Sequence, residues 1–156
     1  MKTYNPDELK AILDSHVEWL NGSGGQRADL YGANLSNTDL HNTDLHNTNL
    51  RYADLTGANL RGVDLSGANL YGANLHGAVL TGADLRDVIG NGVEVKSFRA
   101  EPWHIVYTGN IVAIGCEQHT KSKWLKFTDD RISEMDPRAL VWWKEWKPKL
   151  IEMGIF

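Results

Sequence analysis

The chain has 156 residues, of which 42% are hydrophobic and 23% charged, a size and composition suited to one soluble domain or one domain with a small partner. Its net charge of −4 disfavours a nucleic-acid-binding protein, and its single cysteine excludes an intrachain disulfide framework. The first residues contain no apolar signal core, and no window approaches the length of a membrane span. These features lead us to expect a cytoplasmic protein that does not bind membranes.

Residues 1–25 are predicted to form a capping helix followed by a glycine-rich linker. Asn5 is a suitable N-cap residue, and Glu8 lies at the spacing that completes a capping box. Apolar residues recur on one helical face, namely Leu9, Ile12, Leu13, Val17 and Leu20. Such a face has to be buried, and the nearest apolar surface is the open end of the structure that the next segment builds.

Residues 26–90 contain a strict repeat of five residues. Leu recurs at every fifth position from Leu30 to Leu85, twelve times in all, and two residues before it stands Ala eight times, Thr three times and Val once. Between these two lies Asp six times, Asn five times and Val79 once. In an extended segment, Leu and the residue two before it point inward, and the Asp or Asn points outward. The unit ends on Gly seven times and Asn three times, so we expect a turn with positive φ there.

This run of A-(D/N)-L-x-x units resembles the pentapeptide-repeat family. The resemblance implies a mainly β fold, a right-handed, four-sided β-helix with twenty residues per coil and therefore about three coils for the twelve units. Open ends would expose leucines and unpaired backbone, so both ends need a cover. We expect the N-terminal helix to cover one end and residues 91–156 the other.

The segments on either side of the repeat also resemble pentapeptide proteins that are common in bacteriophages and prophages. The resemblance rests on His16-x-x-Trp19-Leu20, Gly24-Gly25-x-Arg27, Ile114-Gly115-Cys116-x-x-His119 and Trp143-x-x-Trp146-Lys147. It implies a host protein, such as a defence component, as the partner, and it implies no defined activity.

Residues 91–156 are predicted to form a small α+β domain. Gly109-Asn110 is a good hairpin turn between two apolar runs. This register pairs Tyr107 with Val112, Ile105 with Ile114, and Trp103 with Cys116 on one apolar face. Helices are expected near 121–127, 129–135 and 137–153, the last with an apolar face of Leu140, Trp143, Trp146, Leu150 and Met153.

Three apolar residues at the end of the repeat suggest where this domain packs on the coil. Val79 takes an outward position that otherwise holds Asp or Asn, and Val88 and Ile89 follow the last unit. We predict that all three lie at the contact between the coil and the C-terminal domain.

With twenty residues per coil, two outward columns become candidate partner-binding surfaces. One column holds Tyr31, Arg51 and Tyr71, and the other holds Asp44, Asp64 and Asp84. Tyr and Arg are favoured at interfaces, and their stacking allows cation–π contact. The acidic column is either an anionic surface like a phosphate backbone or a set of side chains that hydrogen-bond neighbouring corners, and we favour the second interpretation.

Cys116 and His119 are the residues that most resemble a catalytic pair or half of a metal site. No orienting group or oxyanion site accompanies them in the sequence. The predicted register places Cys116 on the core face, where a free cysteine acts as a small hydrophobe. We therefore expect no enzyme, no cofactor and no metal. His41, His46 and His76 are expected on the surface, and His16 in a local structural contact near Trp19.

Three functions remain open. The first is a non-enzymatic module that binds or inhibits a host protein, with a homodimer as one option. The second is a DNA-mimic inhibitor of a type II topoisomerase, as the resemblance to quinolone-resistance pentapeptide proteins implies, but a short coil imitates little duplex. The third is small-ligand binding or cysteine-dependent chemistry in the C-terminal domain.

Overall fold

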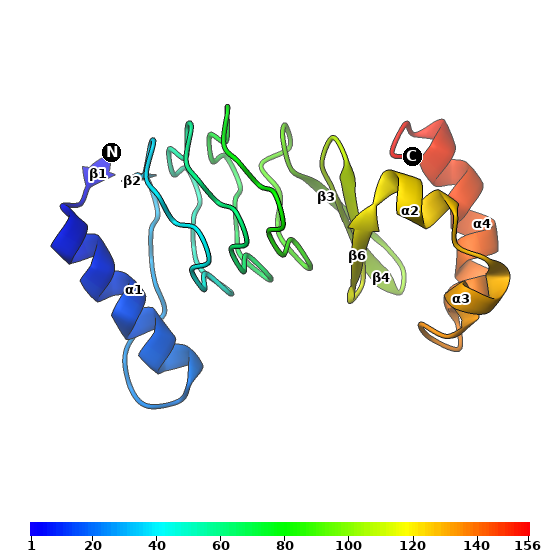
Figure 1. Cartoon of the computed structure of the whole chain (residues 1–156), viewed down its shortest axis with the longest axis horizontal. Helices are drawn as coiled ribbons and strands as arrows, with labels where there is room; N and C mark the ends of the chain where they lie inside the picture. The colour runs from blue at the N-terminus through cyan, green and yellow to red at the C-terminus, as the bar shows by residue number, and fades with distance from the viewer.

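The computed structural model describes residues 1–156 and shows a central coil with a helix at one end and a unit of sheet and helices at the other (Figure 1). The elements in chain order are β1 (Lys2–Thr3), α1 (Pro6–Leu20), β2 (Ala33–Asn34), β3 (Lys96–Ala100), β4 (Trp103–Tyr107), β5 (Ile111–Ile114), β6 (Glu117–Thr120), α2 (Lys121–Leu125), α3 (Asp129–Ser133) and α4 (Ala139–Glu152). None of the helices has the length and apolar character that a membrane crossing requires.

The repeat builds a β-helix-type coil whose layers recur every twenty residues. Parallel bridges join each outward residue to the one twenty positions later, from Asp29 with Asn49 to Asn69 with Ile89. Within this ladder, Leu45 N–H donates to Asp64 O (2.8 Å) and Asp64 N–H donates to Thr43 O (3.1 Å). The backbone of each layer is therefore paired with the layers before and after it.

Each unit turns at its last residue, as the Gly and Asn pattern predicts. The next amide donates to the Leu carbonyl three residues back, for example Ala33 N–H to Leu30 O at 3.1 Å. The ten Gly and Asn corners have φ between 56° and 74°, the left-handed value that this turn requires. The other two corners hold Tyr52 and Asp87 instead of Gly or Asn, and they too have positive φ (57° and 56°).

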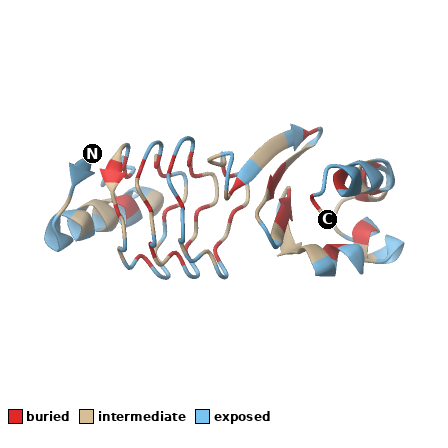
Figure 2. Ribbon diagram, turned by 90° about the horizontal axis from the view of Figure 1, so that it is seen from above, coloured by how far each residue is buried: buried red, intermediate tan, exposed pale blue.

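Leucines and small side chains fill the interior of the coil. Buried residues accordingly recur along the layers of the coil in Figure 2. Every repeat leucine except Leu80 is buried, and each contributes about 1.5–3 kcal/mol of hydrophobic stabilisation before chain entropy is subtracted. The same core continues through Val95, which directly precedes β3, into one face of the C-terminal sheet at Val106 and Ala113. The sheet therefore covers the end of the coil directly.

At the N-terminal end, α1 has the capping box that the sequence predicts. Asn5 Oδ1 accepts from Glu8 N–H (2.9 Å), and Glu8 Oε2 accepts from Asn5 N–H (2.9 Å). The predicted apolar face is correct except at Val17, which is 43% exposed, because His16 faces the coil in its place and is fully buried. The parallel pairing of β1 with β2 was not expected from the sequence.

The C-terminal sheet has four strands in the order β3-β4-β5-β6, all antiparallel. The predicted pairs Ile105 with Ile114 and Tyr107 with Val112 are confirmed. The predicted pairing of Cys116 is wrong. Strand β5 ends before it, Gly115 turns the chain with φ 57°, and Cys116 is exposed in the connection to β6. The edge strands β3 and β6 escaped prediction because their mixed polar sequences show no apolar alternation.

The three C-terminal helices lie where the sequence predicts them, but the buried face of α4 is shifted. Trp142 is buried beside Trp143, and its Nε1–H donates to the carbonyl oxygen of Ala100 at the end of β3 (3.1 Å). Met153 is exposed because α4 ends at Glu152 and Met153 is its C-cap. The helical stripe in the sequence predicted Trp143 and missed Trp142.

The predicted contact between the coil and the C-terminal sheet is correct for one of three residues. Val88 is buried in the shared core. Val79 and Ile89 are 37% and 47% exposed, so their assignment to the contact is wrong. Val79 and Ile89 lie in outward columns, where they bridge to the Asn residues twenty positions earlier, Asn59 and Asn69. The sheet packs instead over the interior of the last layer.

Candidate interaction surface

Tyr31, Arg51, Tyr52 and Tyr71 form a cluster on one corner of the coil, here called the tyrosine–arginine cluster. The guanidinium carbon of Arg51 lies 5.9 Å from the ring centroid of Tyr31, 5.7 Å from that of Tyr52 and 5.9 Å from that of Tyr71. The predicted cation–π contact in this column is confirmed. The three rings are 52%, 43% and 54% exposed, so the cluster is a surface feature.

Tyr52 lies at the centre of the cluster, although the sequence did not lead us to place it in this column. Its ring meets Tyr31 edge-to-face (centroids 5.6 Å apart) and Tyr71 in the same way (5.7 Å). The ring lies over Gly72, where a Cβ would be 2.6 Å from Tyr52 Cδ1. The signal in the sequence was a large side chain at a corner position that holds Gly or Asn in every other unit except the last, which holds Asp87.

Backbone hydrogen bonds between successive layers of the coil fix the main chain beneath the cluster. Gly32 N–H donates to Arg51 O (2.9 Å), and Tyr52 N–H donates to Tyr71 O (3.0 Å). Positive φ costs a non-glycine residue roughly 1–2 kcal/mol, and bulky residues rarely adopt it. Tyr52 therefore keeps a strained conformation that Gly or Asn would relieve, and such strain is concentrated at functional sites.

The acidic column is assembled as expected, but it is not a continuous anionic surface. Bridges join Asp44 to Asp64 and Asp64 to Asp84. Each carboxylate accepts from the backbone two residues on, which is the turn-stabilising role. Burial opposes ionisation of Asp84, but hydrogen bonds and charge from Arg86 outweigh it and lower the pKa of this carboxyl. The ion pair with Arg86 neutralises one end of the column.

Beside this column, a serine, a histidine and an aspartate lie together without forming a catalytic triad. Ser66 Oγ–H donates to Asp64 Oδ1 (2.6 Å), so Ser66 Oγ accepts from His46 Nδ1 (2.7 Å). His46 Nε2 in turn accepts from Asn47 Nδ2 (2.8 Å). A histidine that donates to the serine cannot take its proton, so this arrangement does not activate a nucleophile.

The model of the family described as pentapeptide repeats matches residues 26–62 and 49–87, with eight copies. The chain belongs to the pentapeptide-repeat family. No curated protein matches the sequence.

Solved structures of other pentapeptide-repeat proteins are similar to parts of this one. A pentapeptide repeat protein from the thylakoid lumen of Arabidopsis thaliana is 38% identical over 38% of this chain and 41% of its own, with a TM-score of 0.38. QnrB1, a plasmid-mediated fluoroquinolone resistance protein, is 30% identical over 40% of this chain and 30% of its own (TM-score 0.38). HetL from Nostoc sp. strain PCC 7120, involved in heterocyst differentiation regulation, is 34% identical over 42% and 39% (TM-score 0.31). The chain therefore spans less than half the length of each of these relatives.

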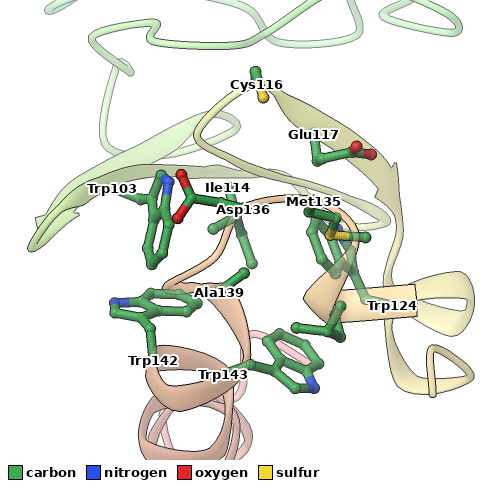
Figure 3. Close-up of a pocket in the computed structure, with 11 residues that line it drawn as sticks. Trp103, Ile114, Cys116, Glu117, Trp124, Met135, Asp136, Ala139, Trp142 and Trp143 are labelled. Atoms are coloured by element: carbon green, nitrogen blue, oxygen red, sulfur yellow. The ribbon is translucent and has the colours of Figure 1, made fainter. Parts of the chain in front are cut away.

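Outside the pentapeptide coil, a small apolar pocket of about 70 Å³ lies between the sheet and the helices (Figure 3). Its walls include Trp103, Trp124, Trp142 and Trp143. A space of this size admits a small apolar group but not a drug-sized ligand, which needs about 300 Å³ or more.

Cys116 and His119 are not brought together at this pocket. His119 Nε2 hydrogen-bonds Glu117 Oε2 (2.8 Å), and its ring packs against Trp124 (5.4 Å) and Phe127 (5.0 Å). No hydrogen bond joins Cys116 to His119, and no group of three or more His, Cys, Asp or Glu side chains has a metal-site arrangement. The pair therefore shows no nucleophile–base geometry.

His16 is the one buried polar side chain that ties α1 to the coil of this pentapeptide-repeat protein. Ala28 N–H donates to His16 Nδ1 (3.2 Å), so the ring proton sits on Nε2 and points at Thr48 Oγ1 (3.2 Å). Burial lowers the pKa of His16, and the nearby Asp44 only partly offsets this. The expected contact with Trp19 is present as a stacked pair 5.6 Å apart.

Proposed function

We propose that this pentapeptide-repeat protein is a non-enzymatic protein-binding module and that the tyrosine–arginine cluster is its contact surface. The observation that carries the proposal is Tyr52, a strained and exposed residue held at the centre of a cluster that the core does not need. Tyr and Arg are the residues in which binding hot spots are enriched. Because the coil already fixes the rings, binding would cost little side-chain entropy.

The finer architecture and the partner belong to the same proposal. We propose a right-handed, four-sided coil of about three turns, divided from its flanks near residues 25 and 90, with Asp44, Asp64 and Asp84 as a secondary contact column. From the resemblance of the flanks to phage and prophage proteins, we propose that the partner is a host protein, such as a defence component.

Comparative affinity capture tests the proposal. Tagged wild-type protein and a Tyr52→Asn variant are incubated with bacterial host lysate, and recovered proteins are quantified by mass spectrometry. Asn keeps the positive φ, as at the other Asn corners, so the coil should remain folded. We expect recovery of the specific partner to fall about tenfold, the effect of losing one hot-spot side chain.

Arg51→Ala and Arg61→Ala make a matched pair for this experiment. The backbone N–H of each arginine donates a 3.3 Å hydrogen bond to an Asn Oδ1 two residues back, but only Arg51 contacts the tyrosines. Arg51→Ala should reduce recovery and Arg61→Ala should not. Equal recovery by wild type, Tyr52→Asn and Arg51→Ala would reject the cluster as the contact surface.

The DNA-mimic alternative has weaker support because Arg86 neutralises one end of the acidic column. A gyrase supercoiling assay with purified protein separates the two functions. Inhibition at micromolar concentration that survives Tyr52→Asn would favour the mimic over the protein-binding module.

A further inference from the structure

We infer that the first layer of the coil has an open edge at residues 38–44 and that this edge receives a basic segment of a partner polypeptide, which pairs with the short sides at Asp39 and Asp44 and bends at the corner between them, where Asn42 has φ 56°. The edge lies at the N-terminal end of the coil, in the groove between the coil and α1, and it does not include the tyrosine–arginine cluster.

The backbone hydrogen bonds identify the open edge. In the second layer, Asn59 N–H donates to Thr38 O (3.0 Å), and Asn59 O accepts from Leu40 N–H (3.0 Å). Asp39 and Asp44 occupy the equivalent outward positions of the first layer, where no earlier layer exists. Their N–H and C=O groups have no backbone partner, and both residues are exposed. An unpaired row of this kind is a template for another strand.

Two other parts of the coil boundary are closed by elements of the chain itself. On the neighbouring side of the first layer, β1 pairs in parallel with β2, and Lys2 N–H donates to Gly32 O (3.0 Å). At the far end of the acidic column, Gln118 Oε1 accepts from Leu85 N–H (2.7 Å) and its Nε2 donates to Ala83 O (2.6 Å). On one side of the first layer, β1 is therefore already added as a strand. The sides that contain Asp39 and Asp44 have no such added strand.

A groove of about 640 Å³ lies over the open edge, bounded by α1 on one side and by residues 38–44 on the other. Figure 1 shows α1 beside the first layer at this end of the molecule. Leu9, Leu13 and Val17 give the helical wall an apolar surface. The volume accommodates several residues of an extended chain, which would lie roughly 4.8 Å from the first layer.

The charges along the groove select the sequence of the added strand. Asp14, Asp39 and Asp44 line it, and Lys10 is its only lysine or arginine. Lys10 is paired with Asp14, so neither coil carboxylate has a lysine or arginine partner in the groove, although His41 Nδ1 lies 2.8 Å from Asp39 Oδ1. Hydrogen bonds from His41 lower the pKa of Asp39, so this carboxylate is ionised at neutral pH. A segment with Lys or Arg five positions apart toward these carboxylates, and apolar residues between them toward α1, fits both walls.

The test uses full-length protein labelled with ¹⁵N and an acetylated, amidated peptide of about six residues, Lys-Val-Thr-Gly-Val-Lys, whose lysines have the spacing of Asp39 and Asp44 and whose glycine can bend at the corner. Titration should shift the amide signals of Asp39 and Asp44 and slow their exchange with solvent. The same peptide with glutamate in place of both lysines should not bind. The lysine peptide with alternate backbone nitrogens methylated should bind at least about tenfold more weakly, because it cannot complete the ladder.

A matched pair of double variants tests the carboxylates. Asp39→Asn with Asp44→Asn removes two charges but keeps the oxygen that accepts from the backbone two residues on, the role that Asn34 and Asn49 already fill. We expect at least about tenfold weaker peptide binding. Asp130→Asn with Glu152→Gln removes the same charge from the C-terminal helices and should leave the affinity unchanged.

Several outcomes would overturn the inference. These are no binding at millimolar peptide, signal shifts that map away from residues 38–44, and equal binding of the methylated peptide. Concentration-dependent dimerisation of the free protein that Asp39→Asn with Asp44→Asn abolishes would also overturn it, because a second copy would then occupy the edge.

Discussion

The coil and the C-terminal unit are stabilised in different ways. In the coil, one side-chain type and one turn recur, and each residue depends on neighbours twenty positions away. In the C-terminal unit, nothing repeats, and contacts such as Trp142 with Ala100 join residues 42 positions apart. The aromatic residues show the consequence. The tryptophans on α2 and α4 pack into the second core, whereas the coil tyrosines lie exposed on a surface whose stability comes from leucine. A self-sufficient interior leaves the exterior of the coil free to carry binding residues.

The largest effect should come from the aromatic core. Trp124→Ala removes a buried ring and the hydrogen bond from its Nε1 to Val112 O (2.8 Å), so we expect a loss of about 3–5 kcal/mol in unfolding free energy. Denaturant unfolding followed by near-UV circular dichroism measures it. Trp19→Ala, whose residue is 37% exposed, is the control with a small effect. Equal losses for both variants would contradict the assignment of a separate aromatic core.

The next effect tests whether each layer of the coil contributes independently. Leu65→Ala empties the middle of a buried column between Leu45 and Leu85, and we expect a loss of about 2–5 kcal/mol. Leu80→Ala changes the same position of the repeat where the leucine is only partly buried, so its loss should be smaller. Urea denaturation of both variants makes the comparison. A larger loss for Leu80→Ala would show that the end of the coil, not its middle, limits stability.

The smallest effect concerns pH, and it should distinguish the N-terminal end of the coil from the rest. Burial lowers the pKa of His16 below its ordinary value near 6.5, so the folded protein favours the neutral ring. The stabilisation is complete above that pH and is lost as the pH falls through the lowered value. Unfolding free energies near pH 7.5 and pH 5 should therefore differ less in His16→Gln than in wild type. The protection factors of the α1 amides, which correct for the intrinsic pH dependence of hydrogen exchange, should fall at the lower pH more in wild type than in the variant, and an equal fall in both would count against this role.

Prediction from sequence succeeded where the structure is encoded within a few residues. Asn5 and Glu8 form their capping box, and the Gly and Asn corners take positive φ, because these conformations depend only on neighbours along the chain. The hairpin register held for the same reason up to Ile114. It failed at Cys116, where Gly115 starts a turn into a polar edge strand that no periodicity marks.

The sequence by itself determined that this protein is a pentapeptide coil with leucine inside and polar residues outside, because every unit carries its own turn and its own inward residue. Only the tertiary structure decided which outward residues meet. It placed Tyr52 between Tyr31 and Tyr71, set His16 against Thr48, and left the edge at Asp39 and Asp44 without a strand. These contacts depend on the stacking of layers and on the angle at which α1 meets the coil, and no local pattern specifies either.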